Sequence, residues 1–297
     1  MSCAERSIGS LQITMALRCR YGYNAVTRMP AGDNPSTMQP WQTAIVDAGP
    51  AHLRVRGYDA LELMQHATFT DMIFLLHHTR LPTDGERRLI DAILIGGADH
   101  GPGAPSCAAA RLAASGNRQS LSAAVAAGVL TIGDEHGGAG SACMELIAEG
   151  LERSRERGTS FAAEAARIVD AARANNTRLP GFGHRVHSVI DPRVDVLFDL
   201  ARANNLAGDG IAFARALEAA IAERIKRIPL NIDGGLAAIL HDLGFPPMFG
   251  KLVFIISRVA GISAEVLEEY TREKPMRIKF PVEYDGAPPR ENGSEES

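Results

Sequence analysis

The sequence predicts an all-α fold, and three observations support this prediction. Apolar residues recur three or four positions apart in several segments, which places them on one face of a helix. Long alternations of apolar and polar residues, the signal of half-buried strands, are missing. Aromatic residues, which strands favour, make up only 5% of the 297 residues.

The first predicted helices lie in the N-terminal half of the chain. Residues 59–79 and 86–97 both have the helical spacing of apolar side chains. Thr83 with Glu86 indicates a capping box at the start of the second segment. Residues 119–131 carry a further apolar series, formed by Leu121, Ala124, Val125, Ala127 and Leu130.

Further helices are expected towards the C-terminus. Residues 210–228 predict a helix with one apolar stripe. Gly244 is a helix stop signal, and Ser263 is a candidate N-cap for a last helical segment. The stripe of the 210–228 segment consists of Phe213, Leu217, Ile221, Ile225 and Ile228.

The composition excludes several classes of function. Hydrophobic residues make up 45% and charged residues 22%, as in ordinary globular proteins. The net charge of −4 gives no general attraction to nucleic acid or to an anionic membrane. No apolar run approaches the roughly 20 residues that span a bilayer. We therefore predict no nucleic-acid partner and no membrane partner.

The ends of the chain and its cysteines indicate a cytoplasmic protein. The N-terminus lacks the basic head and clean apolar stretch of a secretory signal. The 4 cysteines show no CxxC spacing, which favours reduced thiols. Residues 1–39, with scattered Pro and Gly, are expected to form a loosely held arm, and the polar residues 287–297 a disordered tail.

Four short segments combine Gly with His or Asp and interrupt the helical pattern. They are ADHGPG (98–103), GDEHGGAG (133–140), PGFGHRVHSVIDPR (180–193) and NIDGG (231–235). Glycine lets a backbone approach a ligand closely, and loops on a rigid helical frame commonly carry functional residues. One such loop is weak evidence, but four in one chain predict a site.

Together these segments resemble the citrate synthase superfamily, and within it the citryl-CoA lyases and the matching domain of ATP-citrate lyase. The resemblance extends from about Arg56 to Gly286. ADHGP and LTIGDEHGGA are the forms associated with the lyases, and PGFGH followed by DPR and a downstream NID is specific in order and spacing. The resemblance implies a two-domain helical fold and a reaction that makes or breaks the carbon–carbon bond between acetyl-CoA and oxaloacetate.

The resemblance implies three catalytic residues. Asp233 matches the family's base, which removes a proton from the thioester methyl group. His136 matches the neutral imidazole that hydrogen-bonds the thioester oxygen of the enol. His184 matches the imidazole that faces the ketone oxygen of oxaloacetate. Histidine suits both tasks because its pKa lies near neutrality.

The resemblance also implies the substrate-binding residues. Arg193 and Arg258 match arginines that bind substrate carboxylates, which planar guanidinium groups hold through paired contacts. His100 matches a histidine that contacts oxaloacetate or citrate. The family's C-terminal Arg-Pro, contributed by a partner subunit, is replaced here by Lys274-Pro275, so the carboxylate ligand is left open among Arg272, Lys274 and Arg277.

Coenzyme A, as part of the substrate, is the expected cofactor. The resemblance assigns the adenine to Gly181, Phe182 and Gly183, and its phosphates to Lys226 and Arg185; a solvated helix face is an equal alternative for Lys226. The HRVH spacing of His184 and His187 resembles a metal pair. It has no acidic or cysteine ligand nearby, so no metal is predicted.

The resemblance implies a large domain of residues 40–139 and 236–286 and an inserted small, CoA-binding domain of residues 140–235. The site would lie in the cleft between them, and a homodimer or a higher homo-oligomer is expected. Citryl-CoA lyase is the preferred function. The alternatives are a citrate or 2-methylcitrate synthase, a non-catalytic subunit that binds CoA or citrate, and a helical interaction scaffold, whose function has no use for Gly-His loops.

Overall fold

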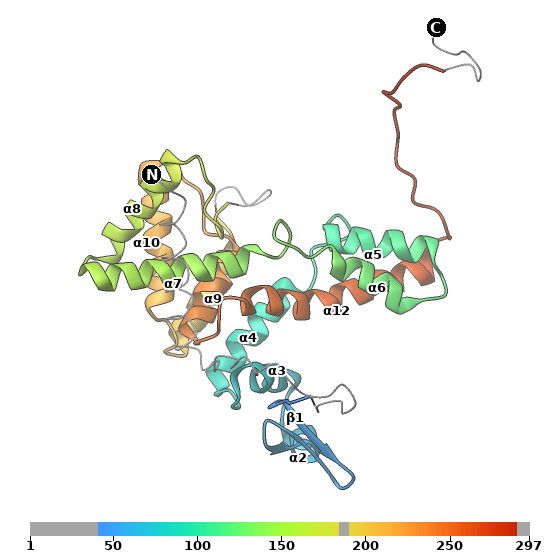
Figure 1. The fold of residues 1–297 in the computed structure, drawn as a ribbon, viewed down its shortest axis with the longest axis horizontal. Helices are drawn as coiled ribbons and strands as arrows, with labels where there is room; N and C mark the ends of the chain where they lie inside the picture. The colour runs from blue at the N-terminus through green and yellow to red at the C-terminus, as the bar shows by residue number, and fades with distance from the viewer. Residues whose placement is uncertain (1–40, 184–189, 290–297) are drawn as a thin grey trace, which may run out of the picture. The chain divides into compact units, whose positions relative to one another are not determined.

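The computed structural model describes residues 41–183 and 190–289. They form two compact units. The first takes the described residues up to His100 together with Ile132–Gly261, and the second takes Gly101–Thr131 and the described residues from Ile262 onward. Eleven helices and one small sheet lie in the described part of the chain (Figure 1), which confirms the all-α prediction.

The first unit begins with an antiparallel sheet that was not predicted from the sequence. Its strands are β1 (Val46–Gly49), β2 (His52–Val55) and β3 (Tyr58–Asp59), in the order β1-β2-β3. Val55 is its only buried residue and lies opposite both Val46 and Tyr58. Strands this short, on a largely exposed sheet, carry no alternation that a sequence pattern can show.

Three helices follow: α2 (Ala60–His66), α3 (Phe69–His78) and α4 (Asp84–Gly97). The predicted helix 59–79 is therefore two helices, because Thr68 starts a new one with a capping box to Asp71. The predicted capping box between Thr83 and Glu86 is confirmed.

The core of the first unit surrounds α11 (Ile232–Asp242). This helix packs against α7 (Ala139–Arg157), α9 (Pro192–Ala203) and α10 (Asp209–Arg224), and α8 (Phe161–Ala174) packs on α7 and α10 (Figure 1). Every residue of α11 from Gly234 to Leu240 is buried. A helix buried on all sides is apolar on all sides, so its position is tightly defined by its neighbours.

The ends of α10 and α11 were only partly predicted. Phe213, Leu217 and Ile221 of the predicted α10 stripe are buried, but the helix ends at Arg224, and Ile225 is 45% exposed. Pro229 disfavours helical backbone at the residue before it, so the segment leaves the helix before residue 228. The predicted stop after α11 is confirmed, since Gly244 has a φ of +80°.

Helix α12 (Phe249–Arg272) runs from the first unit into the second. The expectation that Ser263 caps a separate helix was wrong, because the helix continues through this position. Ile262 and Val266 are both buried at helical spacing on either side of it, so the apolar face of α12 stays in phase.

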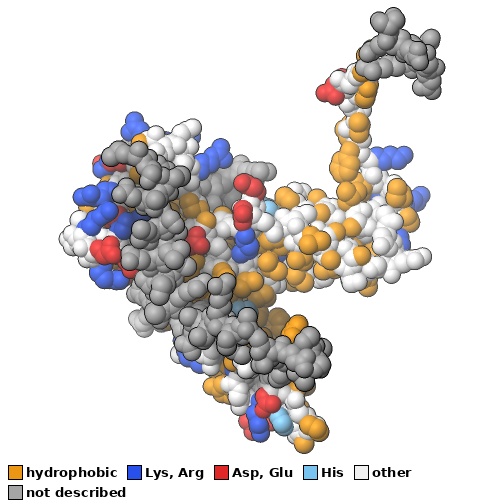
Figure 2. Space-filling model, in the orientation of Figure 1, with side chains coloured by type: hydrophobic (Ala, Val, Ile, Leu, Met, Phe, Trp, Pro, Cys, Tyr) orange, Lys and Arg blue, Asp and Glu red, His pale blue; other side chains and the backbone are white. Residues whose placement is uncertain are grey.

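The second unit consists of α5 (Pro105–Gly116), α6 (Leu121–Leu130) and the end of α12. A Cβ atom on Gly128 of α6 would lie 2.8 Å from the carbonyl oxygen of Ser106 in α5, so the two helices touch through their backbones. Only Ala124 and Gly128 of α6 are buried, and Leu121 and Leu130 are 58% and 84% exposed. Figure 2 shows apolar side chains gathered over α5 and α6.

A buried ionic cluster stabilises this unit. Arg111 of α5 binds Glu265, Glu268 and the fully buried Glu269 of α12. Arg277 also binds Glu269, with 2.9 Å between its Nε and Oε1. A buried carboxylate such as that of Glu269 is stable only when it is paired with a cation. The pairing with Arg277 therefore holds the segment that follows α12 against this helix.

Two expectations about the whole chain remain as they were. Both predicted domain boundaries, after residue 139 and after residue 235, fall inside the first unit. The division into a large and a small domain therefore stays a prediction. Among the described residues, no helix combines the length and the apolar character needed to cross a bilayer.

Replacing Glu86 tests the capping box at α4. Its carboxylate binds Arg80 at 2.6 and 2.9 Å and the backbone N–H of Thr83 at 2.7 Å. Chiefly through Arg80, these contacts lower its pKa from 4.5 to about 2. We expect Glu86→Gln to lower the free energy of unfolding by about 1–2 kcal/mol at pH 7. The expected loss is modest because Arg80 is partly exposed, and solvent weakens its attraction to Glu86.

The pH dependence of this loss provides a second check. A lowered folded-state pKa stabilises the protein above pH 4.5, and the stabilisation disappears as the pH falls towards 2. Urea unfolding of wild type and Glu86→Gln should therefore converge over that range. Asp84→Asn, at a 93% exposed carboxylate of the same turn, is the control and should change the free energy by less than about 0.5 kcal/mol. A pH-independent difference for Glu86→Gln would contradict the assignment.

Candidate active site

The start of α11 is fastened to the predicted adenine-binding loop. Asn231 caps the helix by accepting a hydrogen bond from the N–H of Gly234 at 3.1 Å. Its amide donates to the carbonyl of Gly183 at 2.7 Å, and its backbone N–H donates to the carbonyl of Gly181 at 3.0 Å. The N–H of Gly183 donates to the carbonyl of Pro229 at 2.8 Å. The loop and the helix start thus form one hydrogen-bonded body.

Glycine is required on both sides of this contact. Gly181 has a φ of +84°, and a Cβ atom there would lie 2.6 Å from Sγ of Cys143 and 2.8 Å from Cα of Gly234. A Cβ atom on Gly234 would lie 2.4 Å from the carbonyl oxygen of Gly181. The PGFG and NIDGG segments therefore meet backbone to backbone, which explains the glycines that the sequence places in each.

Asp233 lies in the first turn of α11 and is partly buried. Burial raises the pKa of its carboxyl group; the positive charges of Arg193 and Arg258 lower it, and the negative charge of Asp191 raises it. Burial and Asp191 outweigh the arginines, so the pKa of Asp233 lies above its ordinary value. A carboxylate with a raised pKa is a stronger base when ionised and a usable acid when protonated.

Arg193, near the start of α9, is held in place by Asp191. Its Nε donates to Oδ1 of Asp191 at 2.9 Å, and its Nη2 donates to Oδ2 at 2.8 Å. The Asp191 side chain is completely buried, and 28% of the Arg193 side chain is exposed. Arg193 therefore presents a fixed positive charge beside Asp233.

Arg258 of α12 links Asp233 with His136. Its Nε donates to the carbonyl of Gly97 at 2.9 Å, and its guanidinium lies 4.8 Å from the ring centre of Phe254. The ring of His136 meets the same phenyl ring edge-on, with centroids 5.6 Å apart. Burial, together with the charge of Arg258, lowers the pKa of His136. The imidazole is therefore neutral at physiological pH and can hydrogen-bond an oxygen without carrying charge.

The loop that carries His136 is anchored at its ends. The N–H of Gly133 donates to the carbonyl of His136 at 3.0 Å. The Nζ atom of Lys251 in α12 binds the carboxylate of Asp134 at 2.5 Å. The backbone N–H of Lys251 donates to the hydroxyl oxygen of Ser141 at 2.8 Å. These contacts keep the GDEHGG loop on the same helix that carries Arg258.

Four predicted residues thus come together in the first unit: Asp233, Arg193, Arg258 and His136. The carboxylate is an acid–base group, the imidazole is a neutral hydrogen-bonding group, and the two arginines suit substrate carboxylates. His184 and Arg185 were predicted to act here, but they lie outside the described residues.

The other predicted residues of the first unit lie around this group or on the surface. Gly181, Phe182 and Gly183 form the loop on α11, with Phe182 bridged to Leu230. Lys226 is exposed in the segment after α10, not on that helix. His100 is exposed after the end of α4. Their predicted contacts with substrate stay predictions.

Two predicted substrate ligands belong to the second unit. Lys274 is exposed. The guanidinium of Arg277 is bound by Glu269 and by Glu273, whose carboxylate lies 3.1 Å from Nε. Arg272 pairs with Glu268 at 3.0 Å. Of the three, Lys274 alone has no ion pair among the described residues.

The roles of two residues were not predicted from the sequence. Asp191 was noted only as part of the DPR element, although Asp before Pro at a helix start is a recognisable N-cap signal. Cys143 was assigned only a reduced thiol, yet it lies under Gly181. Burial, with the nearby charge of Asp233, raises its pKa to about 12, so it is an inert part of the core.

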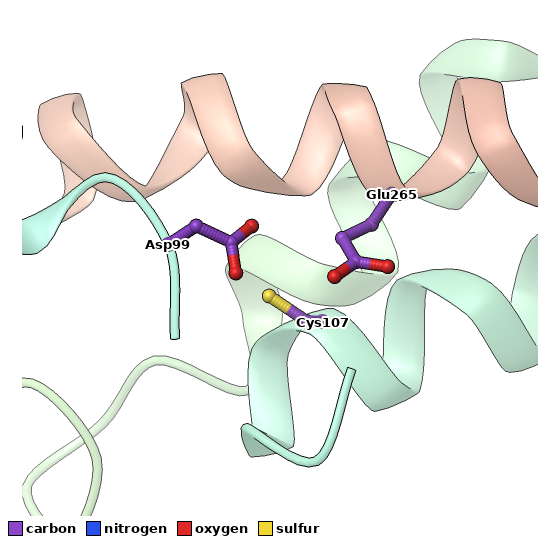
Figure 3. A group of neighbouring side chains, drawn as sticks. All are labelled: Asp99, Cys107 and Glu265. Carbon is purple, nitrogen blue, oxygen red and sulfur yellow. The ribbon is translucent and has the colours of Figure 1, made fainter. Parts of the chain in front are cut away.

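Among the described residues of the second unit, two potential metal ligands lie close together. The Sγ atom of Cys107 in α5 lies within 4.8 Å of a carboxylate oxygen of Glu265 in α12 (Figure 3). Asp99, which is also labelled in Figure 3, belongs to the first unit. Arg111 already binds the Glu265 carboxylate. Two potential ligands are fewer than a zinc site needs. That the protein uses no metal stays a prediction.

Near the buried start of α11, the carboxylate of Asp233, the imidazole of His136 and two arginines lie close enough to influence one another's charge. The family model for the citrate synthase C-terminal domain matches residues 82–279. The chain belongs to the citrate synthase family.

The structural and curated relatives point to two activities within this family. The fold is similar to citryl-CoA lyase from Hydrogenobacter thermophilus, with a TM-score of 0.79 and 38% identity over 86% of this chain and 98% of that one. The fold also matches an ATP citrate lyase from Methanothrix soehngenii, solved in complex with citrate and coenzyme A. The TM-score is 0.68, with 21% identity over 92% of this chain and 49% of that one. At this identity the match shows the fold alone.

Curated relatives carry the other name. A citrate synthase from Deinococcus radiodurans is 31% identical over 69% of this chain and 53% of its own length. One from Haloferax volcanii is 29% identical over 73% of this chain and 54% of its own length. The chain therefore spans about half the length of these curated relatives.

Removing each arginine separates their electrostatic roles. Arg258 lowers the pKa of both His136 and Asp233, whereas Arg193 lowers the pKa of Asp233. We expect Arg258→Gln to raise the pKa of His136 and of Asp233. Arg193→Gln should raise the pKa of Asp233 and leave His136 unchanged. NMR titration of the imidazole and carboxyl resonances measures both. A shift of His136 in Arg193→Gln as large as in Arg258→Gln would contradict this arrangement.

Proposed function

We propose that this chain is a citryl-CoA lyase, which cleaves citryl-CoA to acetyl-CoA and oxaloacetate. The observation that carries the proposal is the 38% identity to a citryl-CoA lyase over 98% of that enzyme's length. The grouping of Asp233, His136, Arg193 and Arg258 supports it, because the reaction needs acid–base groups beside cations that hold carboxylates.

In the proposed cleavage, His184 takes the proton from the tertiary hydroxyl group of citryl-CoA. The carbon–carbon bond breaks as the hydroxyl carbon becomes the ketone of oxaloacetate. The bonding electron pair moves to the acetyl thioester and forms its enol or enolate, whose oxygen accepts a hydrogen bond from His136. Protonated Asp233 then gives its proton to the methylene carbon, which yields acetyl-CoA. Condensation is the reverse of these steps.

The two electrostatic findings support these roles. The raised pKa of Asp233 favours the protonated form that cleavage consumes. The lowered pKa of His136 keeps the imidazole neutral, so that it stabilises the enol without a full charge.

The binding residues follow the same proposal. Arg193 and Arg258 would hold carboxylates of the oxaloacetate half, with His100 as a further contact. Gly181, Phe182 and Gly183 would receive the adenine of coenzyme A, and Lys226 and Arg185 its phosphates. Lys274 or Arg277 would contribute from a partner subunit, and Lys274 is the better candidate because Glu269 already binds Arg277.

A citrate or 2-methylcitrate synthase is the second candidate, and the names of the curated relatives favour it. A synthase condenses acyl-CoA with oxaloacetate and also hydrolyses the citryl thioester, which releases free CoA. A non-catalytic CoA- or citrate-binding subunit would not need a carboxylate of raised pKa beside a neutral imidazole. We rank it third for that reason.

We further propose that the protein works as a homodimer. Leu112 of α5 and Leu121 and Leu130 of α6 are 45%, 58% and 84% exposed, which is a large apolar surface for a helix pair. A two-fold interface would cover it with the same surface of a second copy.

We also propose that residues 140–235 close over the substrate. This closure would exclude water from the enol.

Two assays of the purified protein distinguish lyase from synthase. We expect citryl-CoA to yield oxaloacetate without release of free CoA. A coupled assay that reduces oxaloacetate measures its formation. Acetyl-CoA with oxaloacetate should release no free thiol. Release of CoA and citrate from the second mixture would replace the lyase with a synthase, and the same result with propionyl-CoA would indicate a 2-methylcitrate synthase.

Asp233→Asn tests the acid–base group within the same assays. We expect turnover of citryl-CoA to fall by about 10²–10⁴-fold, because the amide neither gives nor takes the proton. Asp242→Asn, at the other end of the same helix, is the control. It should lower stability, since Asp242 accepts three backbone hydrogen bonds, but leave turnover by the folded protein within about threefold. Full activity of Asp233→Asn would remove this residue from the mechanism.

Leu130→Glu tests the homodimer. A buried charge without a partner opposes association, so we expect the wild type at twice the monomer mass and the variant at the monomer mass in light scattering. Leu61→Glu, at a 64% exposed leucine of α2 in the first unit, is the control and should keep the wild-type mass. A monomeric, fully active wild type would contradict the proposal.

A further inference from the structure

The carboxylate of Asp191 is completely buried, yet it accepts four hydrogen bonds from two elements of the site. The N–H, Nε and Nη2 groups of Arg193 donate three of them, at 3.2, 2.9 and 2.8 Å. The fourth comes from the backbone N–H of Ile232, at 3.0 Å. Burial alone would raise the pKa of Asp191, but the bonds and charge of Arg193 and the bond from Ile232 lower it, so Asp191 is ionised.

Through Asp191, these bonds connect Arg193 with the start of α11. Ile232 is the first residue of α11 and is adjacent to Asp233, and Arg193 is the second residue of α9. One carboxylate therefore fixes the start of α11 and the guanidinium of Arg193 relative to each other. Bidentate arginine–carboxylate pairs have a defined plane and direction, so the orientation of the guanidinium is defined as well.

Asp191 occupies only one edge of the guanidinium. Nε and Nη2 face Asp191, whereas Nη1 makes no hydrogen bond or ion pair with any described residue. The edge formed by Nη1 and the second N–H of Nη2 remains for another carboxylate. The exposed 28% of the Arg193 side chain allows a ligand to reach it.

Arg193 has a second potential partner within the protein. Its charge already acts on Asp233, which lies next to Ile232 on α11. An arginine released from Asp191 would be drawn to Asp233, because an ionised carboxylate in a partly buried site attracts the nearest cation. That pairing would occupy the arginine and weaken Asp233 as an acid–base group.

We propose that Asp191 is a positioning residue: it holds the guanidinium of Arg193 towards the carboxylate of a dicarboxylate substrate and prevents Arg193 from pairing with Asp233. This inference rests on the proposed function, since it takes oxaloacetate, or the oxaloacetate half of citryl-CoA, as the ligand of Arg193. It adds a residue that itself touches neither substrate nor the reacting atoms.

A double-mutant cycle tests the proposal. Asp191→Asn removes the bidentate acceptor while keeping the size of the side chain. We expect it to weaken oxaloacetate binding, measured by calorimetry, by about tenfold to a hundredfold, because the arginine turns to Asp233. In the double variant Asp191→Asn/Asp233→Asn that partner is neutral, so binding should return to within about threefold of Asp233→Asn alone. A merely structural role of Asp191 would make the two losses additive.

Asp242→Asn is the matched control, because Asp242 is another carboxylate that accepts backbone hydrogen bonds at a helix start without contacting an arginine of the site. It should lose stability but bind oxaloacetate as the wild type does. Unchanged binding in Asp191→Asn, or additive losses in the cycle, would overturn the positioning role.

A ligand-free measurement separates this inference from the proposed function. The groups that act on Asp233 are Arg193, Arg258, Asp191 and the buried Cys143. The carboxyl resonance of Asp233 should titrate at lower pH in Asp191→Asn than in the wild type. When Arg193→Gln is also present, the shift should be smaller, because only the direct loss of the Asp191 charge then acts on Asp233. A wild type that binds no oxaloacetate would refute the function, whereas a shift of equal size with and without Arg193 would refute the positioning role.

Discussion

The site depends on one close approach, the backbone contact between Gly181 and Gly234. No side chain fits between the two segments, since a Cβ atom on either residue would come within 2.8 Å of the other segment. Asn231 then joins them through hydrogen bonds to the carbonyls of Gly181 and Gly183. Because α11 is buried from Gly234 to Leu240, directly after Asp233, the position of Asp233 follows from the packing of the core.

The charges around Asp233 oppose one another in a way that suits an acid–base group. Burial and Asp191 raise its pKa, whereas Arg193 and Arg258 lower it. In the proposed function the arginines bind substrate carboxylates, but alone they would make Asp233 a weak base. The completely buried Asp191 offsets one of them by binding Arg193, and the backbone carbonyl of Gly97 orients the other. The site therefore keeps its cations close to the carboxylate without neutralising it.

The parts of the fold that local sequence determines were predicted, and the parts that tertiary contacts determine were not. The all-α class, the capping box of Thr83 and the stop at Gly244 depend on residues a few positions apart, and all three are present. The continuity of α12 through Ser263 depends on buried neighbours on both sides of that position. In the site, motif order indicated Asp233 and Arg193, but the bond from Ile232 to Asp191 joins residues 41 positions apart, and no local pattern signals it.

In the proposed mechanism, cleavage and condensation pass through the same transition states in opposite order, so the same groups serve both directions. A carboxyl group of raised pKa donates a proton in cleavage and, once ionised, removes one in condensation. In the proposed mechanism a neutral His136 would stabilise the enol in both directions, since it carries no charge that either direction must neutralise. The chemistry that separates a lyase from a synthase is therefore the fate of the citryl thioester after the carbon–carbon bond exists. A lyase must exclude water from this thioester. If Asp233, His136 and their arginines act as proposed, we therefore expect the distinction between the two activities to reside in the walls of the site rather than in these residues.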